Sequence, residues 1–216
     1  MQIVTKFGIR FDQTSKVVDK PLIPEARSET IRASVEGSLR RLQTDHIDLH
    51  FQHRVDPKVE PESVAQTVAA TIDEIYERTG QDSILVPHSQ GGLPGWEVPR
   101  YTEHVAAIVA TEPGAAPTVD SEAYNALLEQ KIPVTFYYGD YIGEEFTDVS
   151  AAAMWSMMAA TADTFAEAYN AADGSSTVVH LPGEGITGNS HFMFQELNND
   201  VIADHIENWI QENVDQ

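Results

Sequence analysis

Hydrophobic and polar positions along the chain follow two patterns, short apolar runs and longer stretches with helical periodicity. The apolar runs are rich in β-branched and aromatic residues and predict six strands, at 2–8, 46–55, 82–87, 104–114, 132–142 and 175–182. The periodic stretches predict helices at 28–43, 62–80, 121–131, 148–172 and 198–214. Strands and helices therefore alternate, which is typical of an α/β fold with a mostly parallel sheet, right-handed crossovers and helices on both faces.

Residues 82–92, DSILVPHSQGG, place a serine in a strand-turn-helix context. The turn HSQGG is a variant of G-x-S-x-G in which Pro87 stands in place of the first glycine. Small residues allow the sharp turn that exposes a serine hydroxyl at the carboxyl edge of a sheet. The pattern makes Ser89 a candidate nucleophile, although short Ser/Gly stretches are also common in loops.

Other polar side chains also fall at the ends of predicted strands, where parallel sheets bind their ligands. A serine hydroxyl needs a base within hydrogen-bond reach, and the base needs an acid that fixes its tautomer. His191, in the loop after the last strand, is the candidate base. The other histidines, including His88 on the turn itself, are interpreted as packed or surface side chains. Glu112 and Asp140 are both candidate acids on this basis.

Composition narrows the range of functions. The length of 216 residues suits one domain with a single core, and the formal net charge is −21. A field this negative repels nucleic acid and anionic membranes. Concentrated salt would screen and solvate so many acidic side chains, so we expect a halophilic source. Folding that improved as salt was removed would contradict this expectation. The absence of cysteine excludes disulfides and thiolate chemistry. With neither a membrane-length apolar run nor an N-terminal leader, we expect a cytoplasmic protein.

From residue 70 onward, five segments occur in order: VPHSQGGLPGW, VAAIVATEPG, IPVTFYYGDYI, VVHLPGEGITGNSHFMFQELNN and IADHIENWI. Together they closely resemble the bacterial esterase 713-like branch of the α/β-hydrolase superfamily. The resemblance implies a three-layer sandwich and a serine esterase that cleaves small carboxylic esters through an acyl-enzyme, without a metal or organic cofactor. It implies Ser89 as nucleophile, His191 as base and Glu112 as acid, with Asp140 lining the site.

The first 65 residues carry different motifs. VTKFGI and SVEGSLRRLQTDHIDLHFQHRVDP are similar to aldo-keto reductases, in which a lysine and a histidine at barrel strand ends polarise the substrate carbonyl. These would be Lys6 and His53 here. The family's proton donor and dinucleotide loops have no counterpart among these residues, so both side chains are interpreted as inherited structure. The chain is thus predicted to join a reductase fragment to the catalytic half of a hydrolase within residues 64–72.

The hydrolase resemblance also implies an oxyanion hole. The backbone N–H of Gln90, the residue after the nucleophile, would be one donor. The second donor in such enzymes comes from a loop after an earlier strand, which here assigns the role to Gly8 or Ile9. Four residues are candidates for lining the acyl pocket, or alternatively for plain core packing: Met154, Trp155, Met157 and Phe192.

We therefore expect a serine esterase in a single α/β-hydrolase-like domain. One alternative is a catalytically weak or inactive hydrolase-like chimera. Another is an NADPH-dependent oxidoreductase of the aldo-keto reductase type, which dinucleotide binding would reveal. Because the first strands of a hydrolase sheet are missing, the N-terminal strand is predicted to be an edge through which two copies form a homodimer.

Overall fold

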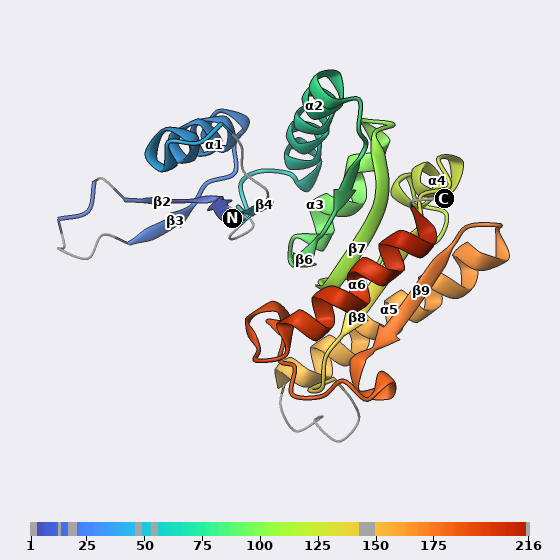
Figure 1. Cartoon of the computed structure of the whole chain (residues 1–216). Coiled ribbons are helices and arrows are strands. Elements are labelled where there is room, and N and C mark those ends of the chain that lie inside the picture. The colour runs from blue at the N-terminus through green and yellow to red at the C-terminus, as the bar shows by residue number, and fades with distance from the viewer. Residues whose placement is uncertain are drawn as a thin grey trace. The chain divides into compact units, whose positions relative to one another are not determined.

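The computed structural model describes the chain except residues 1–3, 13, 17–20, 46–48, 53–55, 143–149 and 215–216. The chain divides into two compact units, residues 1–68 and 69–216, each of which is described by itself (Figure 1). Their boundary lies within helix α2, Pro61–Thr79. This boundary lies within residues 64–72, where the reductase-like and hydrolase-like segments are predicted to join.

The first unit pairs its described strands in two small sheets. β1, Val4–Phe7, runs parallel to β4, Leu49–Gln52. Parallel neighbours need a crossover connection, and this one contains α1, Ser28–Leu42. β2, Ile9–Phe11, and β3, Leu22–Pro24, form an antiparallel pair within the stretch that the sequence patterns leave without regular structure.

The hydrophobic core of the first unit is small. Four buried side chains and two partly buried ones make up its cluster: Phe7, Ala26, Ile31, Val64, Val59 and Val68. The buried carboxylate of Glu25 accepts hydrogen bonds from Arg27 at 2.6 Å and from Arg10 at 3.4 Å. The hydroxyls of Ser28 and Thr67 lie 2.6 Å apart and link α1 to α2. Polar contacts therefore accompany a modest apolar core in this unit.

The second unit is built on a five-stranded sheet in which every described pair is parallel. The strands follow the order β5-β7-β8-β9, and short β6 also pairs with β7. Their bounds are Ser83–Leu85 for β5, His88–Ser89 for β6, Val105–Pro113 for β7, Val134–Tyr138 for β8 and Ser176–His180 for β9. Because the strands are parallel, the residues that follow them gather at one edge of the sheet.

Helices cover both faces of this sheet, with α6 on one side and α5 on the other (Figure 1). The helices are α3 Gly92–Glu97, α4 Glu122–Glu129, α5 Ser150–Ala171 and α6 Asn199–Asn213, with short 3-10 turns η1 Val98–Arg100, η3 Leu181–Glu184 and η4 Met193–Gln195. Successive strand residues face opposite sides. Phe136 of β8 packs against Trp96 of α3 and Phe165 of α5, whereas its neighbour Tyr137 faces α6. The result is three layers.

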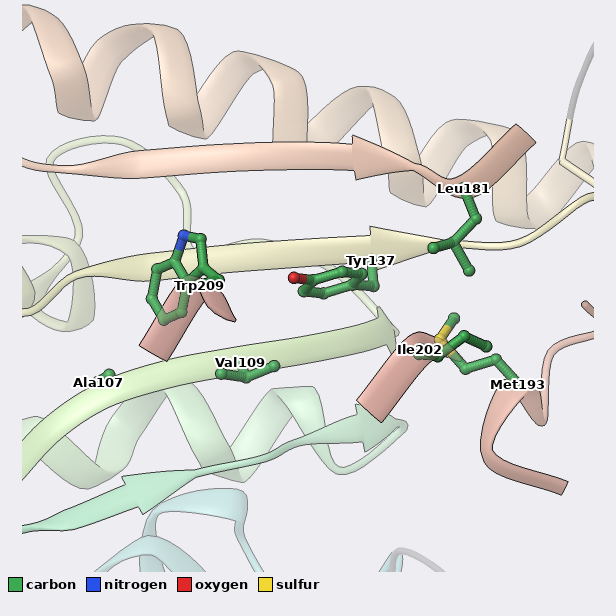
Figure 2. Packing of buried hydrophobic residues seen from close by; sticks show 7 residues of the cluster. All are labelled: Ala107, Val109, Tyr137, Leu181, Met193, Ile202 and Trp209. Atoms are coloured by element: carbon green, nitrogen blue, oxygen red, sulfur yellow. The ribbon is translucent and has the colours of Figure 1, made fainter. Parts of the chain in front are cut away.

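Tyr137 belongs to the apolar cluster between the sheet and α6 (Figure 2). The buried members of that cluster are Ala107, Val109, Tyr137, Leu181, Met193, Ile202 and Trp209. The Tyr137 hydroxyl lies 3.0 Å from Nδ1 of His205, and burial raises the pKa of Tyr137 to about 12. Met193 is fully buried in the core, and it anchors there the end of the loop that carries His191.

The α/β class and the mostly parallel sheet are confirmed, with two differences from the sequence patterns besides the unexpected β2–β3 pair. β1 and β4 pair with each other in a separate sheet, so the main sheet consists of β5 to β9 and not of six strands that include them. The apolar run 82–87 stops pairing at Leu85, because the Val86-Pro87 step interrupts it and Pro87 lacks an N–H. Pairing resumes at His88–Ser89, which the pattern assigns to a turn.

Candidate active site

Ser89, the last residue of β6, lies in the left-handed region of backbone space. Its φ is 55°, which non-glycine residues rarely adopt and which is common at functional sites. The N–H of Gly91 closes the turn by donating to the carbonyl of His88 at 2.9 Å. Gly92 is pressed against β7, because a Cβ there would lie 2.9 Å from Cβ of Pro113. A larger residue at position 92 would therefore displace the turn that carries the Ser89 hydroxyl.

The carboxyl end of β7 is irregular directly beside this turn. His88 pairs with Thr111 but Ser89 pairs with Pro113, so Glu112 is the extra residue of a β-bulge. Glu112 has a φ of 40° and is only 2% exposed. Bulges re-aim side chains next to active sites. This one places a buried carboxylate beside the turn of the candidate nucleophile.

The Glu112 carboxylate binds the ring of His191. Its Oε2 lies 2.6 Å from Nδ1 of His191, and its Oε1 accepts the N–H of Gly139 at 2.8 Å. Because a carboxylate accepts, Nδ1 carries the proton and Nε2 of the neutral ring is left as the acceptor. Among the described residues no hydrogen bond joins the Ser89 hydroxyl to this ring, and such bonds are often long before substrate binds. The tautomer is the one that a general base requires.

Asp140, the other candidate acid, binds the main chain of the loop after β9. Its Oδ1 accepts the N–H of Gly188 at 3.0 Å and its Oδ2 accepts the N–H of Asn189 at 2.7 Å. In return, the N–H of Asp140 donates to the carbonyl of Asn189 at 2.9 Å. Asp140 thus clamps the loop that leads to His191, while Glu112 contacts the His191 ring itself.

The same loop packs tightly against the end of β8. A Cβ on Gly139 would lie 2.5 Å from the carbonyl oxygen of Asn189 and 3.0 Å from Oε1 of Glu112. On its other side the loop is held by Glu196, whose Oε1 accepts the N–H of Ser190 at 3.3 Å and also the Ser190 hydroxyl. Only glycine fits at position 139 without moving the loop or the carboxylate.

Aromatic rings surround the His191 imidazole. Three ring centroids lie close to it: Trp155 at 4.2 Å, His88 at 4.5 Å and Phe192 at 5.1 Å. Phe192 is 49% exposed, so it offers an apolar surface beside the candidate base. Of the residues predicted to line an acyl pocket, Trp155 and Phe192 therefore lie against His191. Met154 and Met157 are exposed on α5.

The predicted oxyanion donors fall in different units. Within the described part of the chain, the N–H of Gln90 donates to no acceptor, as an oxyanion donor awaiting substrate would. Gly8 and Ile9 belong to the first unit, and their role stays a prediction. Lys6 has its main chain on β1, and His53 lies outside the described residues.

The sequence does not predict the contacts of His88. It is interpreted there as a packed or surface side chain, and the structure packs its ring and places its Nε2 2.8 Å from the main-chain oxygen of His191. Burial lowers the pKa of His88, which favours the neutral form of its ring. The signal in the sequence is its position directly before Ser89, which alone does not indicate which distant loop it contacts.

The described ranges hold neither a cluster of metal-ligating side chains nor a membrane-length helix. No group of three or more histidine, cysteine, aspartate or glutamate side chains there is arranged to hold a metal ion. No helix among them has the length and apolar character needed to cross a membrane. The contact at the candidate site is that of the His191 imidazole with the Glu112 carboxylate, and Ser89 lies on β6, which pairs with the strand that carries Glu112.

The N-terminal residues are similar in sequence to oxidoreductases. Residues 1–78 match the model of the aldo/keto reductase family. The uncharacterized oxidoreductase YcsN of Bacillus subtilis (strain 168) is 37% identical over 70 residues, and the probable aldo-keto reductase 1 of Glycine max is 36% identical over 76 residues. These matches cover 32% and 34% of this chain but only 23% and 20% of the relatives. The chain thus spans less than a quarter of each of these curated relatives.

A solved structure supports the other resemblance. The atomic-resolution structure of a novel bacterial esterase superposes with a TM-score of 0.61 at 30% sequence identity. The match covers 72% of this chain and 44% of that chain. The chain is therefore similar to a reductase family at its N-terminus and to an esterase over most of its fold, which confirms the predicted reductase-like fragment.

Proposed function

We propose that the chain is a serine hydrolase that cleaves small carboxylic esters through an acyl-enzyme. The single observation that carries this proposal is the 2.6 Å bond between Glu112 and His191, beside a turn that holds Ser89 at a positive φ. The likeness to a bacterial esterase at 30% identity supports it. Most of that esterase is not covered by this chain, so activity and substrate are inferred from the site.

In the acylation step, the Ser89 hydroxyl attacks the ester carbonyl and His191 Nε2 takes its proton. Glu112 stabilises the imidazolium through Nδ1–H, and the N–H of Gln90 donates to the oxyanion. The tetrahedral intermediate collapses as the carbon–oxygen bond to the alcohol breaks. His191 returns the proton to the departing alkoxide, which leaves as the alcohol.

In the deacylation step, a water molecule replaces the alcohol. His191 Nε2 takes a proton from this water, whose oxygen attacks the acyl carbon of the ester on Ser89. The bond between Oγ and the acyl carbon breaks, the proton returns to Oγ, and the carboxylic acid leaves. The exposed face of Phe192 favours apolar ester groups, and the net charge of −21 disfavours anionic ones.

The test is hydrolysis of a short-chain p-nitrophenyl ester by the purified chain, at low and at high salt. We expect the Ser89→Ala variant to lose at least about 10⁴-fold in kcat. Ser175→Ala is the matched control, because Ser175 is exposed and remote in sequence from the three catalytic candidates. Equal turnover by Ser89→Ala and the natural chain would overturn the proposal.

A folded chain without turnover would favour the second candidate, a hydrolase-like chimera that is weak or inactive. Such a chimera would be weak because its second oxyanion donor is not formed, and loss of one donor typically costs about two to three orders of magnitude in rate. Oxidoreductase activity is a third candidate, favoured by the family match of residues 1–78. NADPH fluorescence titration tests it, and a chain that binds no NADPH would remove it.

The proposed homodimer through an N-terminal strand edge predicts a concentration-dependent sedimentation coefficient.

A further inference from the structure

His88 connects the nucleophile turn to the loop of the base. Its Nε2 lies 2.8 Å from the main-chain oxygen of His191, across 103 positions of sequence. Its ring also packs against aromatic rings of the same loop, with centroids 5.4 Å from Phe192 and 4.8 Å from Phe194. The residue directly before Ser89 is thus in contact with the loop that carries His191.

The chemistry of this contact fixes the direction of the hydrogen bond. A carbonyl oxygen only accepts, so Nε2 of His88 must carry the hydrogen that is donated. Burial, which is the main influence on His88, lowers its pKa, and the neutral ring then has its single N–H at Nε2. Nδ1 of His88 keeps the lone pair. The contact is therefore a specific N–H···O=C bond in addition to ring packing.

His191 is consequently held by two bonds from two neighbouring strands. Its ring donates to Glu112 on β7, and its main chain accepts from His88 on β6. The first bond sets the tautomer and tilt of the imidazole, but it leaves the distance from the ring to the β6 turn open. The second bond ties the base to the residue that adjoins Ser89, which restricts that distance.

We propose that His88 is a positioning residue, whose Nε2–H bond to the His191 carbonyl holds the base in register with the Ser89 hydroxyl. The inference rests on the proposed serine-hydrolase function for its catalytic consequence. The structural claim is that the position of His191 depends on one hydrogen-bond donor at position 88. This claim can be tested without turnover. In this role His88 acts through the main chain of His191 and not on the substrate.

Two substitutions separate the hydrogen bond from the ring packing. His88→Phe keeps an aromatic ring against Phe192 and Phe194 but removes the donor. His88→Gln removes the ring and keeps an N–H at nearly the same reach. We expect His88→Phe to lower kcat by about 10²-fold with KM within about twofold, since a displacement of about 1 Å costs this much, and His88→Gln to recover most of the loss. If His88→Phe keeps its kcat, or both variants lose it equally, the proposal is overturned.

A second readout does not require activity. In the natural chain the His191 Nδ1 proton, bonded to Glu112, should give a low-field proton NMR signal. We expect this signal to persist in His88→Gln and to vanish through exchange in His88→Phe, whereas its persistence in both would overturn the proposal. Absence of turnover in the natural chain would refute the hydrolase function, and the NMR comparison would still decide the role of His88. If His88→Phe does not fold, His88→Met removes the donor with a more adaptable side chain.

Discussion

The two units of the chain differ in how deeply their sheets are buried. The main sheet of residues 69–216 is covered on both faces, with Tyr137 directed to one face and Phe136 to the other, both fully buried. In residues 1–68 the β2–β3 pair leaves Phe11 58% exposed and Leu22 55% exposed. A sheet packed on both sides offers a rigid carboxyl edge on which side chains can be held precisely. The candidate triad lies at such an edge.

Backbone strain is distributed in the same unequal way. The first unit has one described non-glycine residue at positive φ, Gln43, which caps the end of α1 in the left-handed conformation. That is an ordinary way to end a helix. In the second unit, Ser89 and Glu112 adopt positive φ on neighbouring strands of the same sheet. There the surrounding packing maintains a strained backbone conformation, which positions the side chains of a candidate nucleophile and a candidate acid.

The largest expected effect breaks the triad and leaves the fold intact. In Glu112→Gln the new amide can donate to Nδ1 of His191, which moves the ring proton to Nε2 and removes the acceptor for Ser89. We expect kcat to fall by about 10³ to 10⁴-fold. Ester hydrolysis measures the loss, and Glu184→Gln, an exposed acid after β9, is the control that should keep full activity. Activity retained in Glu112→Gln would mean that another acid orients the base.

The next effect concerns stability and compares the two cores. Phe136→Ala should cost about 3 to 5 kcal/mol, because its fully buried ring leaves a cavity between Trp96 and Phe165. Phe7→Ala, in the smaller cluster of the first unit, should cost about 3 kcal/mol, at the lower end of that range. All three tryptophans lie in residues 69–216, so their fluorescence follows that unit in urea unfolding while circular dichroism follows both. Phe7→Ala should therefore change the dichroism curve more than the fluorescence curve. Equal shifts would mean that the units unfold together.

Strand-helix alternation was sufficient to predict the α/β class and most helix positions, because periodicity records which face of an element is buried. It could not predict that β1 and β4 pair with each other, since a strand carries no record of its partner. The residue types identified Ser89 and His191 as candidates but left Glu112 and Asp140 equivalent. The bulge at Glu112 and the loop bonds of Asp140 separate them, and both depend on tertiary packing.

A smaller effect tests the packing that supports the triad. Gly139→Ala places a Cβ 2.5 Å from the Asn189 carbonyl, so the loop must move away from β8. Because His191 follows in the same loop, we expect kcat to fall by about 10²-fold with KM nearly unchanged. Gly183→Ala, where an added Cβ meets open space, is the matched control and should behave like the natural chain. If both variants keep their kcat, the loop tolerates displacement and the glycine is not required for function.

The smallest effect belongs to the first unit and depends on pH. The hydrogen bond from Arg27 is the main reason that the pKa of Glu25 falls from 4.5 to about 2. A carboxyl whose folded pKa is depressed binds protons more readily when unfolded, so its stabilisation is complete above pH 4.5 and is lost as the pH falls towards 2. Arg27 is exposed, and solvent screening should limit the contribution to about 1 kcal/mol. Urea unfolding followed by circular dichroism should show this acid loss in the natural chain and less of it in Glu25→Gln. Tryptophan fluorescence should show no difference between the two, because Glu25 lies outside the unit that contains the tryptophans.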